Sequence, residues 1–121
     1  MTATRFHDRL DPATYEDDDG TVGLFERDPE EADSLWMSER LFRRLTTIGV
    51  AYELHMLSIL NDFEDITFDA IRLESLLDEI AFAAARLDDA ALLPVAQSMA
   101  KYLDDRLRRH AWHGSVVFSF D

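Results

Sequence analysis

The sequence predicts one α+β domain, in which three main helices pack on a small, mostly antiparallel sheet. Two long stretches of the C-terminal half repeat apolar residues at helical spacing, and several short stretches alternate apolar and polar residues as strands do. A chain of 121 residues with 47% hydrophobic content suffices for one core. Residues 1–13 read as a loose arm and 14–121 as the domain, with an all-α bundle as the alternative.

The first predicted element is an acidic hairpin in YEDDDGTVGLFE, residues 15–26. Its DG pair favours a tight turn, because both central residues of such a turn adopt positive φ. The same stretch places Asp17 and Glu26 at ligand positions of a calcium-binding loop, but Tyr15 occupies the first position, where an Asp belongs. We therefore expect a solvated hairpin that does not need calcium.

A helix is predicted over residues 29–45. Asp28 is a suitable N-cap, Pro29 suits the first helical position, and the acidic residues that follow suit the helix dipole. Trp36 falls on the apolar stripe of this helix. A Trp on such a stripe is expected to lie in the core. The alternative is that Trp36 serves, like Tyr15, Phe25 or Phe63, as an aromatic anchor for a basic partner.

The segment TIGVAYELHM, residues 47–56, alternates apolar and polar residues with strict period two, although Val50, Leu54 and Leu57 also fit a helix. Gly49 near its start and its β-branched and aromatic residues favour a strand over 48–57. We predict a strand here, followed by an acidic loop, NDFED.

The C-terminal half predicts two helices and a strand. The first helix starts at a cap, Thr67 or Asp69, and runs to about residue 87, and the second runs from about 90 to 110. The segment SVVFSF then alternates as a closing strand, which we expect to pair with 21–26 or with the 48–57 segment.

The charge balance limits the kinds of partner that this protein can bind. The chain has 25 acidic and 12 basic residues, a net charge of −13, which repels nucleic acids and anionic membranes and attracts basic proteins. It has no Cys and no apolar run of 18 residues, so we expect a cytoplasmic protein without disulfides or a membrane span. Solubility or salt adaptation is the alternative explanation of the charge.

Catalytic and metal-binding signals are weak. The sequence lacks GxSxG, HExxH and a Gly-rich phosphate loop. Glu53 with His55 on the predicted strand, and His110 with His113 near a helix end, are the remaining candidates, and the helix dipole alone explains a His at that end. We expect no enzyme, no metal and no cofactor; a small carboxylate/His enzyme, an accessory subunit and an oligomeric scaffold are the alternatives.

Three acidic clusters, EDDD at 16–19, ERDPEEAD at 26–33 and NDFED at 61–65, predict a surface for a basic protein. Charge would speed encounter and a few aromatic side chains would supply affinity. We expect the clusters to adjoin as one acidic rim. The predicted contact residues are Tyr15, Asp17, Asp18, Asp19, Phe25, Glu26, Glu30, Glu31, Asp62, Phe63, Glu64 and Asp65.

The short, acidic, Cys-free chain, with YELHMLSI, two consecutive helices and a terminal VVFSFD strand, resembles the small cytosolic immunity proteins of bacterial polymorphic toxin systems. The resemblance covers residues 51–121 and concerns size, charge and element order. It implies a non-enzymatic protein that occludes the active site of a toxin through an acidic face. Because immunity families differ in fold, it implies no particular binding residue.

Overall fold

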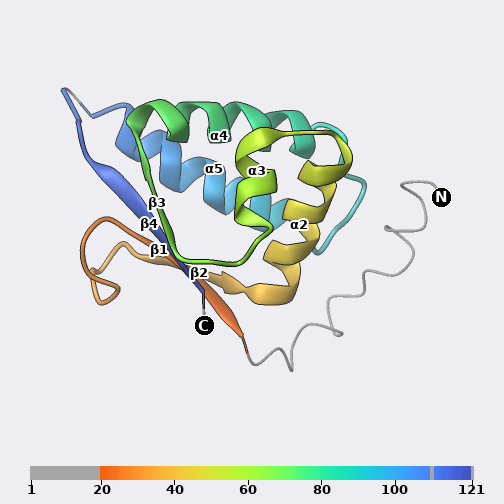
Figure 1. Ribbon diagram of the computed structural model, residues 1–121, viewed down its shortest axis with the longest axis horizontal. Coiled ribbons are helices and arrows are strands. Elements are labelled where there is room, and N and C mark those ends of the chain that lie inside the picture. The colour runs from red at the N-terminus through yellow and green to blue at the C-terminus, as the bar shows by residue number, and fades with distance from the viewer. Residues whose placement is uncertain (1–19, 110, 121) are drawn as a thin grey trace.

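The computed structural model describes residues 20–109 and 111–120. They form a four-stranded antiparallel sheet with helices over one of its faces (Figure 1), which confirms the predicted α+β class. The predicted arm, 1–13, and the first half of the predicted hairpin lie outside the described residues. Among the described helices, none is both long and apolar enough to cross a membrane.

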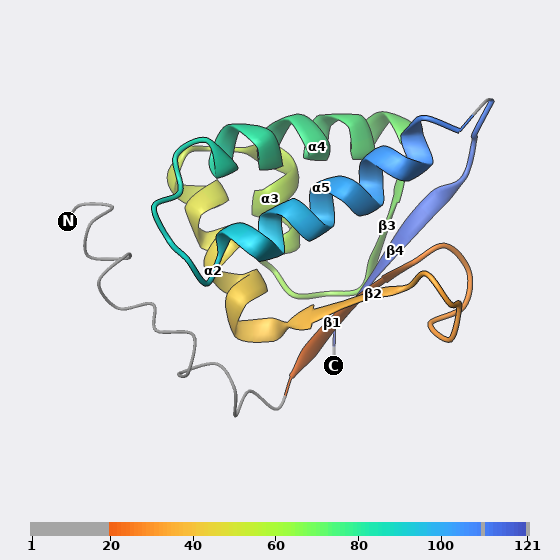
Figure 2. The ribbon, with the colours of Figure 1, turned by 180° about the vertical axis from the view of Figure 1, so that it is seen from behind.

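The sheet has the strand order β2-β1-β4-β3. Strands β1 (Thr21–Phe25) and β2 (Leu35–Ser38) form a hairpin, and the loop of residues 26–34 projects from its end (Figure 2). Strand β4 (Ser115–Phe120) lies between β1 and β3 (Ile66–Asp69). The expected pairing of the C-terminal strand with the 21–26 segment is therefore confirmed.

The core lies between the sheet and the helices. Side chains alternate across each strand, so Val22, Leu24 and Phe118 face the helices and are fully buried. The opposite face, on the side away from the helices, carries Gly23 and Trp36 at paired positions. We call it the open face of the sheet.

The two C-terminal helices agree with the prediction. Helix α4 (Ala70–Ala84) begins at Asp69, whose carboxylate accepts the Arg72 N–H at 3.0 Å. Helix α5 (Leu93–Leu107) has Pro in its first turn, where amides lack internal partners. Both helices bury one apolar stripe against the sheet and against each other.

The predicted helix over 29–45 is wrong in its first half. Residues 35–38 form strand β2, and helix α2 (Glu39–Ala51) begins at Ser38, whose hydroxyl accepts the Leu41 N–H at 3.3 Å. Residues 35–38 form a strand because they pair with β1. Local propensity does not include this contact between separate segments. Trp36 is consequently 48% exposed on the open face instead of lying in the core.

The predicted strand over 48–57 is also wrong. Helix α2 continues to Ala51, and the short helix α3 (His55–Leu60) follows after a turn. The segment is helical because both helices bury apolar residues in the core. The two helices also pack closely at Gly49, where a Cβ would lie only 2.3 Å from Leu57 Cβ. From α4, Glu79 accepts the N–H groups of Met56 (3.0 Å) and Leu57 (2.9 Å) at the start of α3.

This correction removes one pair of catalytic candidates. Glu53 lies in the turn between α2 and α3 with φ of 58°, and His55 is the first residue of α3, so the two do not share a strand face. Of the other pair, His113 lies between α5 and β4, and His110 is outside the described residues.

Candidate protein-interaction site

The loop of residues 26–34 joins β1 to β2 and carries five carboxylates and one arginine over nine residues. Residues 21–25 before it are a strand, so this part of the chain does not have the geometry of a calcium-binding loop. A loop with this charge would repel itself if it were free in solvent. The contacts that hold it therefore determine what it can do.

The loop is first ordered by its own carboxylates. Glu31 Oε1 accepts the N–H groups of Glu26 at 3.0 Å and Arg27 at 3.2 Å. These hydrogen bonds, the one from Arg27 foremost, lower the pKa of Glu31 below its ordinary value. Asp28 Oδ1 accepts the Glu30 N–H at 2.9 Å, a local turn that Asp commonly forms.

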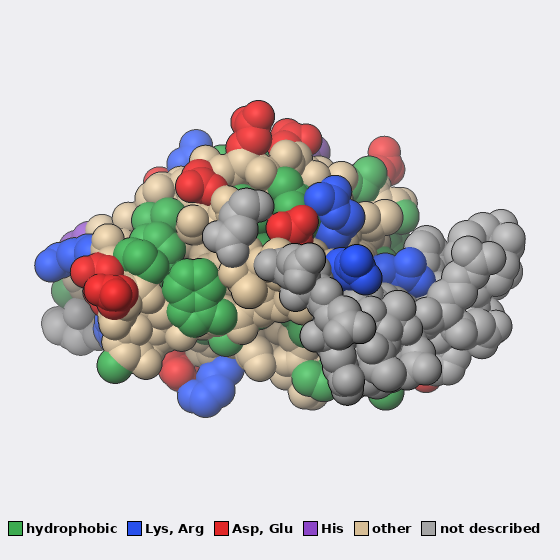
Figure 3. All heavy atoms as spheres, turned by 90° about the horizontal axis from the view of Figure 1, so that it is seen from below, with side chains coloured by type: hydrophobic (Ala, Val, Ile, Leu, Met, Phe, Trp, Pro, Cys, Tyr) green, Lys and Arg blue, Asp and Glu red, His purple; other side chains and the backbone are tan. Residues whose placement is uncertain are grey.

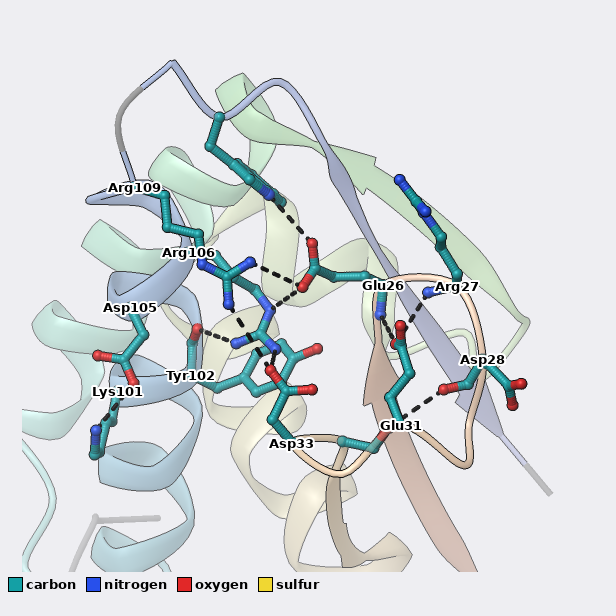
Figure 4. Close-up of polar contacts among 12 residues, drawn as sticks. Glu26, Arg27, Asp28, Glu31, Asp33, Lys101, Tyr102, Asp105, Arg106 and Arg109 are labelled. Carbon is teal, nitrogen blue, oxygen red and sulfur yellow. Dashed lines mark hydrogen bonds and ion pairs between the residues drawn. The ribbon is translucent and has the colours of Figure 1, made fainter.

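The loop is next fastened to α5 by Arg106, whose side chain is only 3% exposed (Figure 4). Its Nη2 forms an ion pair with Asp33, and its Nε lies 3.3 Å from Glu26 Oε2, close enough for an ion pair although not aligned for a hydrogen bond. Its Nη1 donates to the Tyr102 carbonyl at 3.0 Å. A single buried guanidinium thus pairs with two loop carboxylates.

Glu26 is the most connected of these carboxylates. Besides Arg106, it receives Arg109 Nη1 at 3.1 Å and the Trp112 Nε1–H at 3.2 Å (Figure 4). Glu26 therefore links the end of β1 to the end of α5 and to the segment that leads into β4. Charge-assisted bonds of this kind are stronger than neutral ones, so they hold the base of the loop in place.

Tyr102 lies beneath the loop, with the Arg106 guanidinium 3.5 Å above the centre of its ring. Its hydroxyl is buried and makes no hydrogen bond within the described part of the chain. Burial raises the pKa of Tyr102 to about 12, since the phenolate would be desolvated. Tyr102 is therefore a neutral support for the cluster.

A surface cavity of about 620 Å³ opens beside the cluster, lined by residues that include Glu26, Arg109, Trp112 and His113. The Glu26 carboxylate and the Arg109 guanidinium in the lining of this cavity already form an ion pair with each other. In residues 20–109 and 111–120, no group of three or more His, Asp and Glu is arranged to hold a metal ion.

The structure places the predicted contact residues in two separate regions. Phe25 is buried in β1, and Glu26, Glu30 and Glu31 lie in the 26–34 loop. The acids of the 61–65 segment lie at the other end of the sheet, because Asp65 accepts the Phe120 N–H, and Phe120 pairs with Val22 at the start of β1. From Val22 to Phe25 is about 10 Å along the strand.

The expected single rim therefore does not form from the described clusters. The remaining predicted contact residues, Tyr15, Asp17, Asp18 and Asp19, lie outside the described residues.

The 61–65 segment differs in its attachment. Phe63 has φ of 56° and packs its ring against Phe42 (6.0 Å between centroids) and Phe120 (4.7 Å), with the Arg43 guanidinium 4.0 Å above its own centroid. Phe63 is thus a partly buried packing residue, and it is a poor candidate for an exposed aromatic anchor that contacts a partner. Asp62 and Glu64 beside it are exposed.

Sequence reasoning missed Arg106, Trp112 and the exposure of Trp36. One signal was available for Arg106, which lies on the buried stripe of α5 with Met99, Tyr102 and Leu103. A charged residue on a buried stripe requires a partner of opposite charge. The two nearest acids on α5 cannot supply it, because Asp104 and Asp105 form ion pairs with Arg108 and Lys101.

Comparison with known protein families, with curated proteins and with solved structures finds no match for this chain.

Proposed function

We propose that this chain is a binding domain that neutralises a basic protein, as the immunity proteins it resembles do. The observation that carries the proposal is the exposed acidic loop of residues 26–34, which stays attached to the fold through the buried Arg106. Asp28 and Glu30 are exposed at its tip, and Asp33 is 56% exposed even while it pairs with Arg106.

Attachment matters because a loop that must be ordered on binding loses affinity to conformational entropy. The Glu31 and Asp28 hydrogen bonds and the Arg106 ion pairs fix much of this loop before any partner arrives. Its exposed carboxylates therefore present negative charge from a defined position, which favours specificity as well as fast encounter.

The net charge of −13 supports the same proposal over a longer range. A strongly negative protein attracts a basic partner from beyond contact distance, and salt weakens this attraction because charges are screened over roughly 10 Å at 0.1 M ionic strength. Charge that served solubility alone would not require a loop ordered by its own carboxylates and tied to α5.

The test begins with the products of the genes that adjoin the one encoding this chain. Each basic product is expressed with and without this chain, and growth of the host cells and formation of a complex are measured. We expect one product to be toxic alone and harmless in the 1:1 complex, with an association rate that falls steeply between low and physiological salt.

Complex formation without rescue of growth would contradict the neutralising role and leave the binding role in place. An association rate that does not depend on salt would contradict the electrostatic role of the loop.

A further inference from the structure

Trp36 is an exposed aromatic ring fixed on the open face of the sheet. It stands opposite Gly23 in the β1–β2 pairing, and a Cβ at Gly23 would lie 2.6 Å from Cζ3 of the Trp36 ring. The ring therefore covers the glycine, as aromatic residues commonly do beside a glycine in a strand. With 48% of Trp36 exposed, part of the ring remains available to a partner.

Within the described residues, arginines lie over aromatic rings in three places. Guanidinium groups lie 4.0 Å above Phe63, 3.5 Å above Phe82 and 3.5 Å above Tyr102. Over residues 20–109 and 111–120, no arginine lies over Trp36 in this way. Indole attracts a cation more strongly than a Phe or Tyr ring does, so Trp36 offers a strong π surface without a described arginine over it.

The charges near Trp36 select the sign of its partner. Trp36 follows Asp33 by three residues, and the 26–34 loop carries five carboxylates and one arginine. Arg106 and Arg109 pair with two of these carboxylates, and the charge that remains on this part of the surface is negative. Figure 3, a view of the molecule from below Figure 1, shows hydrophobic side chains beside acidic and basic ones at the end that carries this loop. A cationic side chain placed here would meet both a π face and a negative field.

We infer that Trp36 receives an arginine or lysine side chain of a basic protein that docks on the open face of the sheet beside the 26–34 loop. This inference rests on the proposed function, because it names the residue that anchors the partner. Trp and Arg are the side chains most enriched among residues that dominate binding energy, and they contribute most when a partner covers them.

The test uses an octa-arginine peptide as the probe and three proteins: the wild type, Trp36→Phe and Trp36→Leu. Leucine keeps an apolar side chain but removes the π face, whereas phenylalanine retains one. We expect Trp36→Leu to weaken peptide binding about two- to fivefold and Trp36→Phe to recover most of the loss, which is the range for a cation–π contact at an exposed site.

A nuclear magnetic resonance titration of the wild type supplies the second measurement, which does not depend on any variant folding. We expect the peptide to shift the Trp36 indole N–H and the amides of Gly23 and Trp36 more than the Trp112 indole, which is bonded to Glu26.

Unchanged binding by Trp36→Leu would overturn the inference and leave the proposed function standing, since charge alone would then hold the peptide. Failure of the wild type to bind the peptide at low salt would count against both. Loss of a wild-type dimer in Trp36→Leu, seen by sedimentation, would assign the open face to a second copy of the chain and overturn the inference.

Discussion

Two acidic regions of similar composition, the 26–34 loop and the 61–65 segment, are attached to the fold by different forces. The loop is held by ion pairs and hydrogen bonds, with Arg106 buried beneath it. The 61–65 segment is held by the ring of Phe63 in an aromatic cluster, by the hydrogen bond that Asp65 accepts from the Phe120 N–H of β4, and by the one that Asn61 accepts from the Thr46 hydroxyl.

The difference shows that a run of acids in a sequence does not define a binding surface by itself. In the loop, the same carboxylates that give the surface its charge also determine its shape. In the 61–65 segment the exposed acids, Asp62 and Glu64, flank an apolar anchor. Only in the first region should the removal of a charge change both stability and binding.

The largest effect is expected at the centre of the loop cluster. Arg106→Met leaves Glu26 and Asp33 without their buried cation, and we expect the free energy of unfolding to fall by about 2–3 kcal/mol. The value lies below that of a fully buried pair because Asp33 is 56% exposed and Glu26 keeps Arg109. Urea denaturation measures it.

The matched control for this change is Arg108→Met, on the same helix. The Arg108 side chain is 78% exposed and pairs with Asp104 one turn away, so its loss should leave the urea midpoint nearly unchanged. Equal midpoints for the two variants would mean that Arg106 does not hold the loop, and the comparison between the regions would fail.

A smaller effect is expected at the 61–65 segment. Phe63→Ala removes ring contacts with Phe42 and Phe120, and because Phe63 is only partly buried we expect a loss of about 2 kcal/mol, below the range for a fully buried Phe. Amide chemical shifts of residues 26–34 should not change. Changes there as large as those in Arg106→Met would show that the two regions are coupled.

The smallest effect is a pH dependence at Glu31. Its pKa is lowered in the folded state by backbone hydrogen bonds, so its contribution to stability is present above the unfolded value, near 4.5, and is lost as pH falls through the folded value. Glu31→Gln should therefore be less stable than the wild type at neutral pH. This gap should narrow below about pH 4.5, and a constant gap in thermal unfolding across this range would contradict the assignment.

The C-terminal half was predictable because local and global signals agree there. Asp69 caps α4 as its position predicts, and α5 and β4 each carry a full apolar period. The structure of the 29–57 region was not predictable, because its sequence signals are ambiguous. Asp28 and Pro29 suit a turn as well as a helix start, and the apolar residues of 48–57 fit both the period of a strand and that of a helix. Long-range partners, β1 for Leu35–Ser38 and Glu79 for α3, decide these cases.

The candidate site was predictable only in part, for the same reason. The acidic loop is visible in the sequence, but its attachment depends on Arg106, which lies 73 residues from Asp33. The position of Trp36 depends on whether residues 35–38 form a strand or a helix. Local propensity predicted a helix, and the structure has a strand. Sequence separation, and not residue type, limited the prediction.

The most direct test of the account compares two neutralised pairs that are matched in residue type and number. The loop pair is Asp28→Asn with Glu30→Gln, and the control pair is Asp62→Asn with Glu64→Gln; all four side chains are exposed. Affinity for octa-arginine is measured by titration calorimetry at low salt. The account predicts that the loop pair weakens binding about fivefold, from roughly 0.5 kcal/mol for each exposed charge, and that the control pair changes it little. Equal weakening by both pairs would contradict the account, because net charge would then drive binding without a defined acidic site.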